Sequence, residues 1–393
     1  MRRVNCSACG SPWLAEFLDL GTSPIADAYT ATAEESLALE KYPLQLAVCE
    51  KCWLVQLLEV LPQQQLFGTG YSFYTSASPP LSRYHEDYAN MALTSYTSLT
   101  ADRLTVEIGC NDGDLLRHFA LTGCRVLGID PATGPVEVAR SRGLDVQVRP
   151  FSLDYARDIV DQMGHPGLVI ANHVLAHVAD VSDFLAGVAH LLDDDGVALI
   201  EVQYLPDLLV NNAFDLVYHE HRNFFSYTSL QTALNRHGLQ VTRVWETDRQ
   251  GGSLRVEVRR GTATGYRADE SWLQNMGAYE GLQGRVNRIR ERLLDLIDDA
   301  ERERGLPVIG YGAPAKATTL LNFCGLLGLP YAVDTTVAKQ GRCIPGTSTQ
   351  IMPPEGVSDY NTFLLLAWNY MSKIIRLDDR SSWIVPIPAP VRL

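Results

Sequence analysis

The sequence predicts an α/β protein with a small metal-binding module at its N-terminus and two Rossmann-like units after it. Three observations predict this: two Cys-x-x-Cys pairs near the N-terminus, alternating strand and helix patterns from about residue 104 to 244, and a second strand–turn–helix pattern near residue 307. A chain of 393 residues is longer than one hydrophobic core supports. We expect domains at 1–70, 71–250 and 251–393.

Composition excludes several classes of protein. The formal net charge of -13 argues against a surface that binds nucleic acid or anionic membranes without specificity. No apolar run approaches the roughly 20 residues of a membrane span, and the polar residues after Met1-Arg2-Arg3 do not fit a signal peptide. We therefore expect a cytoplasmic protein, in which structural disulfides are rare.

The first module is predicted from its cysteines. Cys6 and Cys9 form one pair and Cys49 and Cys52 the other, and two such turns can present four thiolates to one zinc ion. A redox pair or a chance doublet is the alternative. Four thiolates leave no position for water, so the zinc is expected to be structural.

The central unit carries a glycine-containing turn after a buried strand. Residues 104–108 read as that strand, and Glu107, Gly109, Asn111, Asp112 and Gly113 surround the turn. A second strand ends in Asp130-Pro131, where an acid can bind a ribose diol. The spacing departs from G-x-G-x-x-G and resembles that of S-adenosylmethionine enzymes; an ordinary βαβ unit is the alternative.

Further strands are expected at 125–129, 144–148, 167–171, 197–202 and 240–244. Ligands of doubly wound sheets bind beyond the carboxyl ends of the strands. Phe151, Asn172 and Glu201 fall at or near those ends, as do Gly109 and Asp130. We therefore expect one site along this edge.

Two polar segments could supply chemistry at that edge. One is residues 172–177, with His177, and the other is residues 218–223, with Tyr218, His219, Glu220 and His221. Histidine suits a general base because its pKa lies near neutrality. Metal binding is an alternative for residues 218–221, although an extended segment would point Glu220 away from both histidines.

After the Gly251-Gly252 turn we expect a strand at 253–258, a charged linker helix within 268–304 ending at Gly305, and a second Rossmann-like unit beginning at 307–319. Its turn, Gly310 to Lys316, could cradle a pyrophosphate through backbone N–H groups and Lys316, or could bind nothing. Asp334 could instead hold the ribose of a nicotinamide cofactor.

The order of these motifs resembles the S-adenosylmethionine-dependent C-methyltransferases of deoxysugar biosynthesis, which act at carbon 3 of nucleotide-linked 4-keto sugars. The resemblance extends over nearly the whole chain and includes residues 23–26, the tyrosine-rich loop at 71–76, residues 251–255, 339–342 and 364–370. It implies S-adenosylmethionine and structural zinc as cofactors and a nucleotide-linked keto sugar, dTDP-linked by expectation, as substrate. Nucleic acid and membranes are not expected partners, and the oligomeric state stays open.

The resemblance also implies roles for residues. His221 matches the general base, Tyr218 and Glu220 lie in its motif, His177 matches a second active-site histidine, and Tyr71 or Tyr74 should reach the sugar. The cofactor would be bound by Glu107, Gly109, Asn111, Asp112, Gly113, Asp130, Pro131, Phe151 and Asn172, and the substrate by Asn172, Arg255, Tyr311 and Lys316. A sugar O-methyltransferase and a combined methyltransferase and NADPH-dependent 4-ketoreductase are the alternatives.

Overall fold

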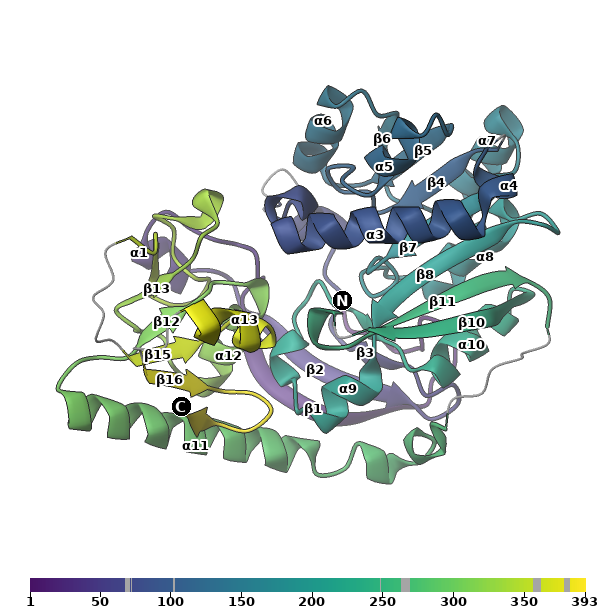
Figure 1. Ribbon diagram of the computed structural model, residues 1–393. Helices are drawn as coiled ribbons and strands as arrows, with labels where there is room; N and C mark the ends of the chain where they lie inside the picture. Colours follow the sequence, from purple (N-terminus) through teal and green to yellow (C-terminus); the bar gives the residue numbers. More distant parts are fainter. Residues whose placement is uncertain are drawn as a thin grey trace.

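Three β-sheets organise the protein, for which we analysed a computed structural model (Figure 1). The structure describes residues 1–67, 71, 73–101, 103–247, 249–262, 269–355, 362–377 and 382–393. The remaining residues include Ser72 of the tyrosine-rich loop and the first residue of the expected 268–304 helix. Within the described residues, no helix is both long and apolar enough to span a bilayer.

The N-terminal sheet has the strand order β1-β2-β3-β9 and is antiparallel. Strands β1 (Leu14–Ser23), β2 (Tyr42–Cys49) and β3 (Val55–Leu57) come from the cysteine-containing segment, whereas β9 (Asn223–Phe224) comes from far along the chain. Because Asn223–Phe224 directly follows residues 218–222, this strand pins the histidine-rich segment against the N-terminal module.

The central sheet has the order β10-β11-β8-β7-β4-β5-β6, with α-helices on both faces. The predicted strands are confirmed as β4 (Thr105–Ile108), β5 (Val126–Asp130), β6 (Val146–Val148), β7 (Leu168–Asn172), β8 (Val197–Gln203) and β10 (Leu239–Thr247). Five of them run parallel, and all but the edge strand β6 are almost wholly buried, as expected of a sheet covered on both faces.

Helices complete the central unit. They are α3 (Pro79–Ser95), α4 (Thr97–Thr100), α5 (Leu116–Leu121), α6 (Thr133–Ser141), α7 (Leu153–Met163), α8 (Val181–Leu191), α9 (Leu205–Val210) and α10 (Tyr227–Asn235). Helix α3 lies across the unit beside β4 and β7 in Figure 1 and packs through Tyr88, Ala89 and Ala92. Helix α3 is followed, after a break at Tyr96, by α4.

The strand expected at 253–258 is β11 (Ser253–Arg260), and it belongs to the central sheet. It pairs antiparallel with both β10 and β8. A domain boundary at residue 250 would therefore cut a β-hairpin. The Gly251-Gly252 turn, with φ of 88° and 117°, reverses the chain direction, so the next strand returns to the same sheet.

The linker helix is α11 (Leu282–Arg304), which is shorter than expected at its N-terminal end, where two 3₁₀ turns precede it, and it ends at Gly305 in a left-handed conformation. It runs beneath the C-terminal unit and the N-terminal sheet in Figure 1. Its buried face packs against residues of both units through Val286, Ile289, Leu293 and Ile297. A single apolar cluster thus joins the first and last units of the chain.

The C-terminal sheet has the order β14-β13-β12-β15-β16-β17 and is parallel except at β17. Its strands are β12 (Ile309–Tyr311), β13 (Tyr331–Val333), β14 (Gln350–Met352), β15 (Thr362–Leu365), β16 (Ser382–Val385) and β17 (Val391–Arg392). Helices α1 (Ala33–Leu37), α2 (Gln63–Leu66), α12 (Ala315–Cys324) and α13 (Met371–Ile374) complete the described fold. The predicted Rossmann-like arrangement of this unit is confirmed.

Candidate active site

The four predicted zinc ligands meet at one point. The Sγ atoms of Cys6, Cys9, Cys49 and Cys52 all lie within 4.8 Å of one another, with Cys6–Cys52 at 3.5 Å and Cys9–Cys49 at 3.6 Å. Tetrahedral zinc–thiolate bonds of about 2.3 Å require sulfur–sulfur separations of about 3.8 Å, so the site fits zinc. Four thiolates complete the coordination, and the zinc is structural.

Removing one zinc ligand should loosen the whole N-terminal module. We expect Cys52→Ser to lose zinc and to lower the thermal unfolding midpoint, because thiolate–zinc bonds hold both turns together. Zinc content by atomic emission and thermal unfolding by calorimetry test this, with Cys124→Ser as a matched control outside the cluster. An unchanged zinc content in Cys52→Ser would contradict the four-cysteine site.

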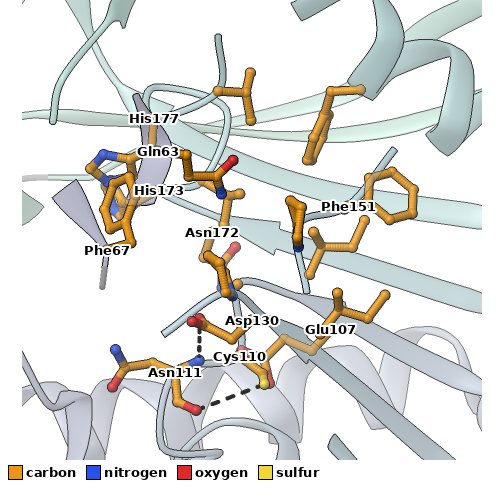
Figure 2. Close-up of a pocket in the computed structure, with 18 of the residues that line it drawn as sticks. Gln63, Phe67, Glu107, Cys110, Asn111, Asp130, Phe151, Asn172, His173 and His177 are labelled. Atoms are coloured by element: carbon orange, nitrogen blue, oxygen red, sulfur yellow. Dashed lines mark hydrogen bonds between the residues drawn. The ribbon is translucent and has the colours of Figure 1, made fainter. Parts of the chain in front are cut away.

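A first cavity, of about 300 Å³, opens at the carboxyl ends of the central strands. Glu107, Gly109, Asn111, Asp130, Pro131, Phe151 and Asn172 line it, as predicted for the cofactor (Figure 2). Asp112 and Gly113 do not line it. Asp112 instead accepts hydrogen bonds from Thr75 and Ser76, and a Cβ on Gly113 would come within 2.3 Å of Leu144.

The cavity is lined by unpaired polar atoms that suit S-adenosylmethionine. Glu107 Oε2 and Asn172 Nδ2 are buried without a hydrogen-bond partner, which is costly unless a ligand pairs with them. Burial and the nearby Asp130 raise the pKa of Glu107 well above its usual value. A Cβ on Gly109 would come within 2.2 Å of Val174, so only glycine leaves room there.

Asn111 and Asp112 bind the tyrosine-rich loop. The amide of Asn111 accepts a hydrogen bond from Thr75 N at 3.0 Å and donates one to Phe73 O at 3.1 Å. Asp130 orients Asn111 in turn by accepting its backbone N–H at 2.9 Å. The cofactor turn therefore carries the loop that bears Tyr71 and Tyr74.

A second, larger cavity of about 520 Å³ lies between the central and C-terminal units. It is lined by every residue predicted to be catalytic and by two of the predicted substrate residues: Tyr71, Tyr74, His177, Tyr218, Glu220, His221, Tyr311 and Lys316. The two cavities share Tyr71, Phe73, Leu81, His173 and His177. The two cavities therefore adjoin at these five residues, which we call the junction.

The ring of His221 is oriented as a base. Its Nδ1 donates to Leu216 O at 2.8 Å, which leaves the Nε2 lone pair to accept from Tyr218 Oη at 2.9 Å. Burial, together with His177, holds the pKa of His221 well below its usual value, so the imidazole is neutral. His177 is oriented in the same way, since its Nδ1 donates to Glu220 O at 2.6 Å, and burial lowers its pKa to about 4.

Glu220 lies in the same wall, and neither of its carboxylate oxygens has a hydrogen-bond partner. Burial and the neighbouring Asp27 raise its pKa to about 8. A protonated Glu220 can donate a hydrogen bond to a ligand oxygen. The sequence did not predict Asp27 as part of this site. Its one signal there is an acidic residue directly after the 23–26 motif.

Residues 218–221 form a turn, so the extended arrangement considered for them is wrong. His219 leaves the cavity, and its Nε2 donates to Pro43 O at 3.3 Å. His221 and Glu220 face the cavity instead. Among the described residues, the cysteine cluster is the group arranged to hold a metal ion.

Arg255 does not line either cavity, which corrects its assignment to the substrate. Its guanidinium is 2.7 Å from Glu201 and lies over the ring of Tyr88. Strand β11 is antiparallel to β8 and places Arg255 directly opposite Glu201, so the arginine neutralises a buried acid. Burial opposes ionisation of Glu201, but His173, Arg255 and Tyr84 together lower its pKa to about 2.

Lys316 lies at the start of α12, as predicted, and its buried Nζ donates to Asn369 Oδ1 at 2.8 Å and sits 3.8 Å from the ring centre of Trp368. Burial lowers its pKa to about 8, although Asp215 opposes the shift. Lys339 is a second ammonium group in this cavity, which the sequence analysis had not assigned to a site. Both carboxylate oxygens of Asp334 accept backbone N–H groups, from Ala313 and Thr336.

Two joined cavities, one bordered by a glycine turn and a strand-terminal acid and the other by neutral imidazoles, define a group-transfer enzyme with a nucleoside cofactor. Three family models match: a zinc binding domain at residues 6–67, a methyltransferase domain at 83–244 and the C-methyltransferase C-terminal domain at 248–388. The chain is 34% identical to C-methyltransferase NovU of Streptomyces niveus over 98% of its own length and 96% of that protein. It belongs to the C-methyltransferase family and is an S-adenosylmethionine-dependent methyltransferase.

Two further similarities each cover half of the chain or less. The ubiquinone biosynthesis O-methyltransferase of Azorhizobium caulinodans is 31% identical over 24% of this chain and 38% of its own. The crystal structure of magnesium protoporphyrin IX methyltransferase from Synechocystis PCC 6803 with bound SAM covers 50% of this chain and 89% of that one, with 16% identity and a TM-score of 0.35. A similarity of that size carries no information on the acceptor.

Proposed function

We propose that the enzyme methylates carbon 3 of a nucleotide-linked 4-keto deoxysugar, with dTDP as the nucleotide. The observation that carries the proposal is the junction, where neutral, oriented imidazoles in the substrate cavity adjoin the cofactor cavity. Methylation of carbon next to a ketone requires removal of a proton and stabilisation of an enolate oxygen. Both kinds of group line the second cavity.

His221 is the proposed general base, because Leu216 fixes its Nδ1–H and its Nε2 lone pair, which accepts from Tyr218 and Gln203, lies at the cavity. Protonated Glu220, or Tyr218 or Tyr71, is placed to donate to the oxygen that becomes negative. S-adenosylmethionine supplies the electrophilic methyl group. Tyr71 lines both cavities, and Asn111 and Asp112 hold the loop that follows it through Thr75.

The shape of the second cavity supports an elongated anionic substrate. From the imidazoles it extends to Tyr311, Lys316 and Lys339 in the C-terminal unit. Two ammonium groups can offset the charge of a pyrophosphate in a chain whose net charge is -13. The nucleotide would then lie against the C-terminal sheet and the sugar against the junction.

A combined 4-ketoreductase is the second candidate. It would need a nicotinamide site, for which the sequence offered Asp334 as the ribose-binding acid. Asp334 directly follows β13 and already accepts hydrogen bonds from Ala313 of the β12–α12 turn and from Thr336. Consumption of NADPH with a 4-keto sugar, measured by absorbance, would establish this second activity.

Replacing the base should abolish methylation while the cofactor still binds. We expect His221→Gln to reduce kcat by about 10²–10⁴-fold, the usual contribution of general-base catalysis, since an amide cannot take the proton. Methyl transfer to a dTDP-4-keto-2,6-dideoxyhexose is followed by mass spectrometry, and S-adenosylhomocysteine binding by calorimetry. His219→Gln is the matched control because His219 lies outside the cavity; equal rates in the two variants would remove His221 as the base.

Activity should fall as the pH is lowered through the pKa of the catalytic histidine. Burial lowers the pKa of His177 to about 4 and holds that of His221 well below its usual value, so both stay neutral well below pH 6.5. A neutral base works above its pKa and is lost below it. The pH profile of kcat should therefore stay flat on its acid side from pH 7 to about pH 5; a limb near 6.5 would mean that an unperturbed histidine is the base.

Removing the charge of Lys316 should weaken substrate binding. We expect Lys316→Met to raise KM for the nucleotide sugar about tenfold or more while S-adenosylhomocysteine affinity is unchanged, because the ammonium group would pair with phosphate. Steady-state kinetics and calorimetry test this. A KM equal to that of the wild type would place the phosphates elsewhere.

A further inference from the structure

The junction contains a third histidine that the proposed mechanism does not use. His173 lines both cavities, and Figure 2 shows it beside His177 and Asn172. Its backbone has a φ of 55°, in the left-handed region, where a residue with a side chain costs about 1 kcal/mol. Such a conformation persists only where the surroundings hold it.

Glu201 holds this residue twice. The backbone N–H of His173 donates to Glu201 O at 2.7 Å, and its ring Nε2 lies 3.1 Å from Glu201 Oε1. The side chain of Glu201 is fully buried and ionised. A carboxylate only accepts hydrogen bonds, so Nε2 carries the proton.

Glu201 is itself held by two further groups from separate elements. Tyr84 of α3 donates to both carboxylate oxygens, at 2.9 and 2.6 Å, and Arg255 of β11 donates through Nε at 2.8 Å. Hydrogen bonds that run from Arg255 and Tyr84 through Glu201 therefore fix the His173 ring at the boundary between the two cavities. Neither Arg255 nor Tyr84 lines a cavity.

We propose that His173 accepts, through Nδ1, a hydrogen bond from the hydroxyl group on the acceptor carbon that is methylated, and so positions that carbon. With Nε2 bound to Glu201, Nδ1 is the atom that remains for a ligand. The proposal rests on the sugar assignment, since it needs a hydroxyl group at that place.

The hydrogen bond would hold the reacting carbon in line with the methyl group. Alignment of two reactants accounts for a large part of the rate of a two-substrate reaction. Loss of the hydrogen bond should therefore slow methyl transfer more than proton removal, which depends on His221. The two steps can be measured separately on the same protein.

The test compares wild type with His173→Ala and Tyr84→Phe. Proton removal is measured as deuterium exchange at carbon 3 of the keto sugar in deuterated water without S-adenosylmethionine, and methyl transfer by mass spectrometry with it. We expect His173→Ala to lower methyl transfer at least tenfold while exchange falls less than threefold. Tyr84→Phe, which removes one donor to Glu201, should reduce methyl transfer in the same direction by a smaller factor.

Equal losses of exchange and methyl transfer in His173→Ala, or no loss in either, would overturn the positioning role. Affinity for S-adenosylhomocysteine, measured by calorimetry, should stay within threefold in both variants; a larger loss would assign His173 to the cofactor. If wild type shows neither exchange nor methylation of the sugar, the sugar assignment fails. The same affinity measurement and rates on another keto acceptor then decide the role of His173.

Discussion

The two cavities share a wall, and the rest of the active site depends on that contact. Tyr71, Phe73, Leu81, His173 and His177 face both cavities. These five residues come from the loop after the N-terminal module, from α3 and from the segment after β7. Methyl transfer between two ligands at the junction requires that all three elements keep their relative positions.

Buried polar contacts fix these elements. Asn111 and Asp112 hold the loop, and Asp114 holds α3 through Ser82 and His85, at 2.7 and 2.9 Å. Strand β9 pairs with β3 and anchors the segment bearing His221 to the module that binds zinc. The zinc cluster therefore supports the proposed base, His221, although the cluster lies outside both cavities.

The sequence predicted the elements better than the contacts between them. The strands of the central sheet and the four zinc ligands were correct because each depends on local pattern or spacing. Arg255 was misassigned because only the pairing of β11 with β8 shows that it faces Glu201. The turn at 218–221 was missed because nothing in four polar residues distinguishes a turn from an extended segment.

Charge explains why so much of the site is neutral. Burial disfavours ionised groups here, and it holds His177 and His221 as neutral imidazoles and Glu220 as a protonated carboxyl group. A neutral imidazole in such a site can accept a proton from carbon without first losing a proton of its own. Among the described residues that line the second cavity, Lys316 and Lys339 carry the positive charge, and they lie in the C-terminal unit. In the proposed binding mode, the anionic end of the substrate therefore lies away from the junction.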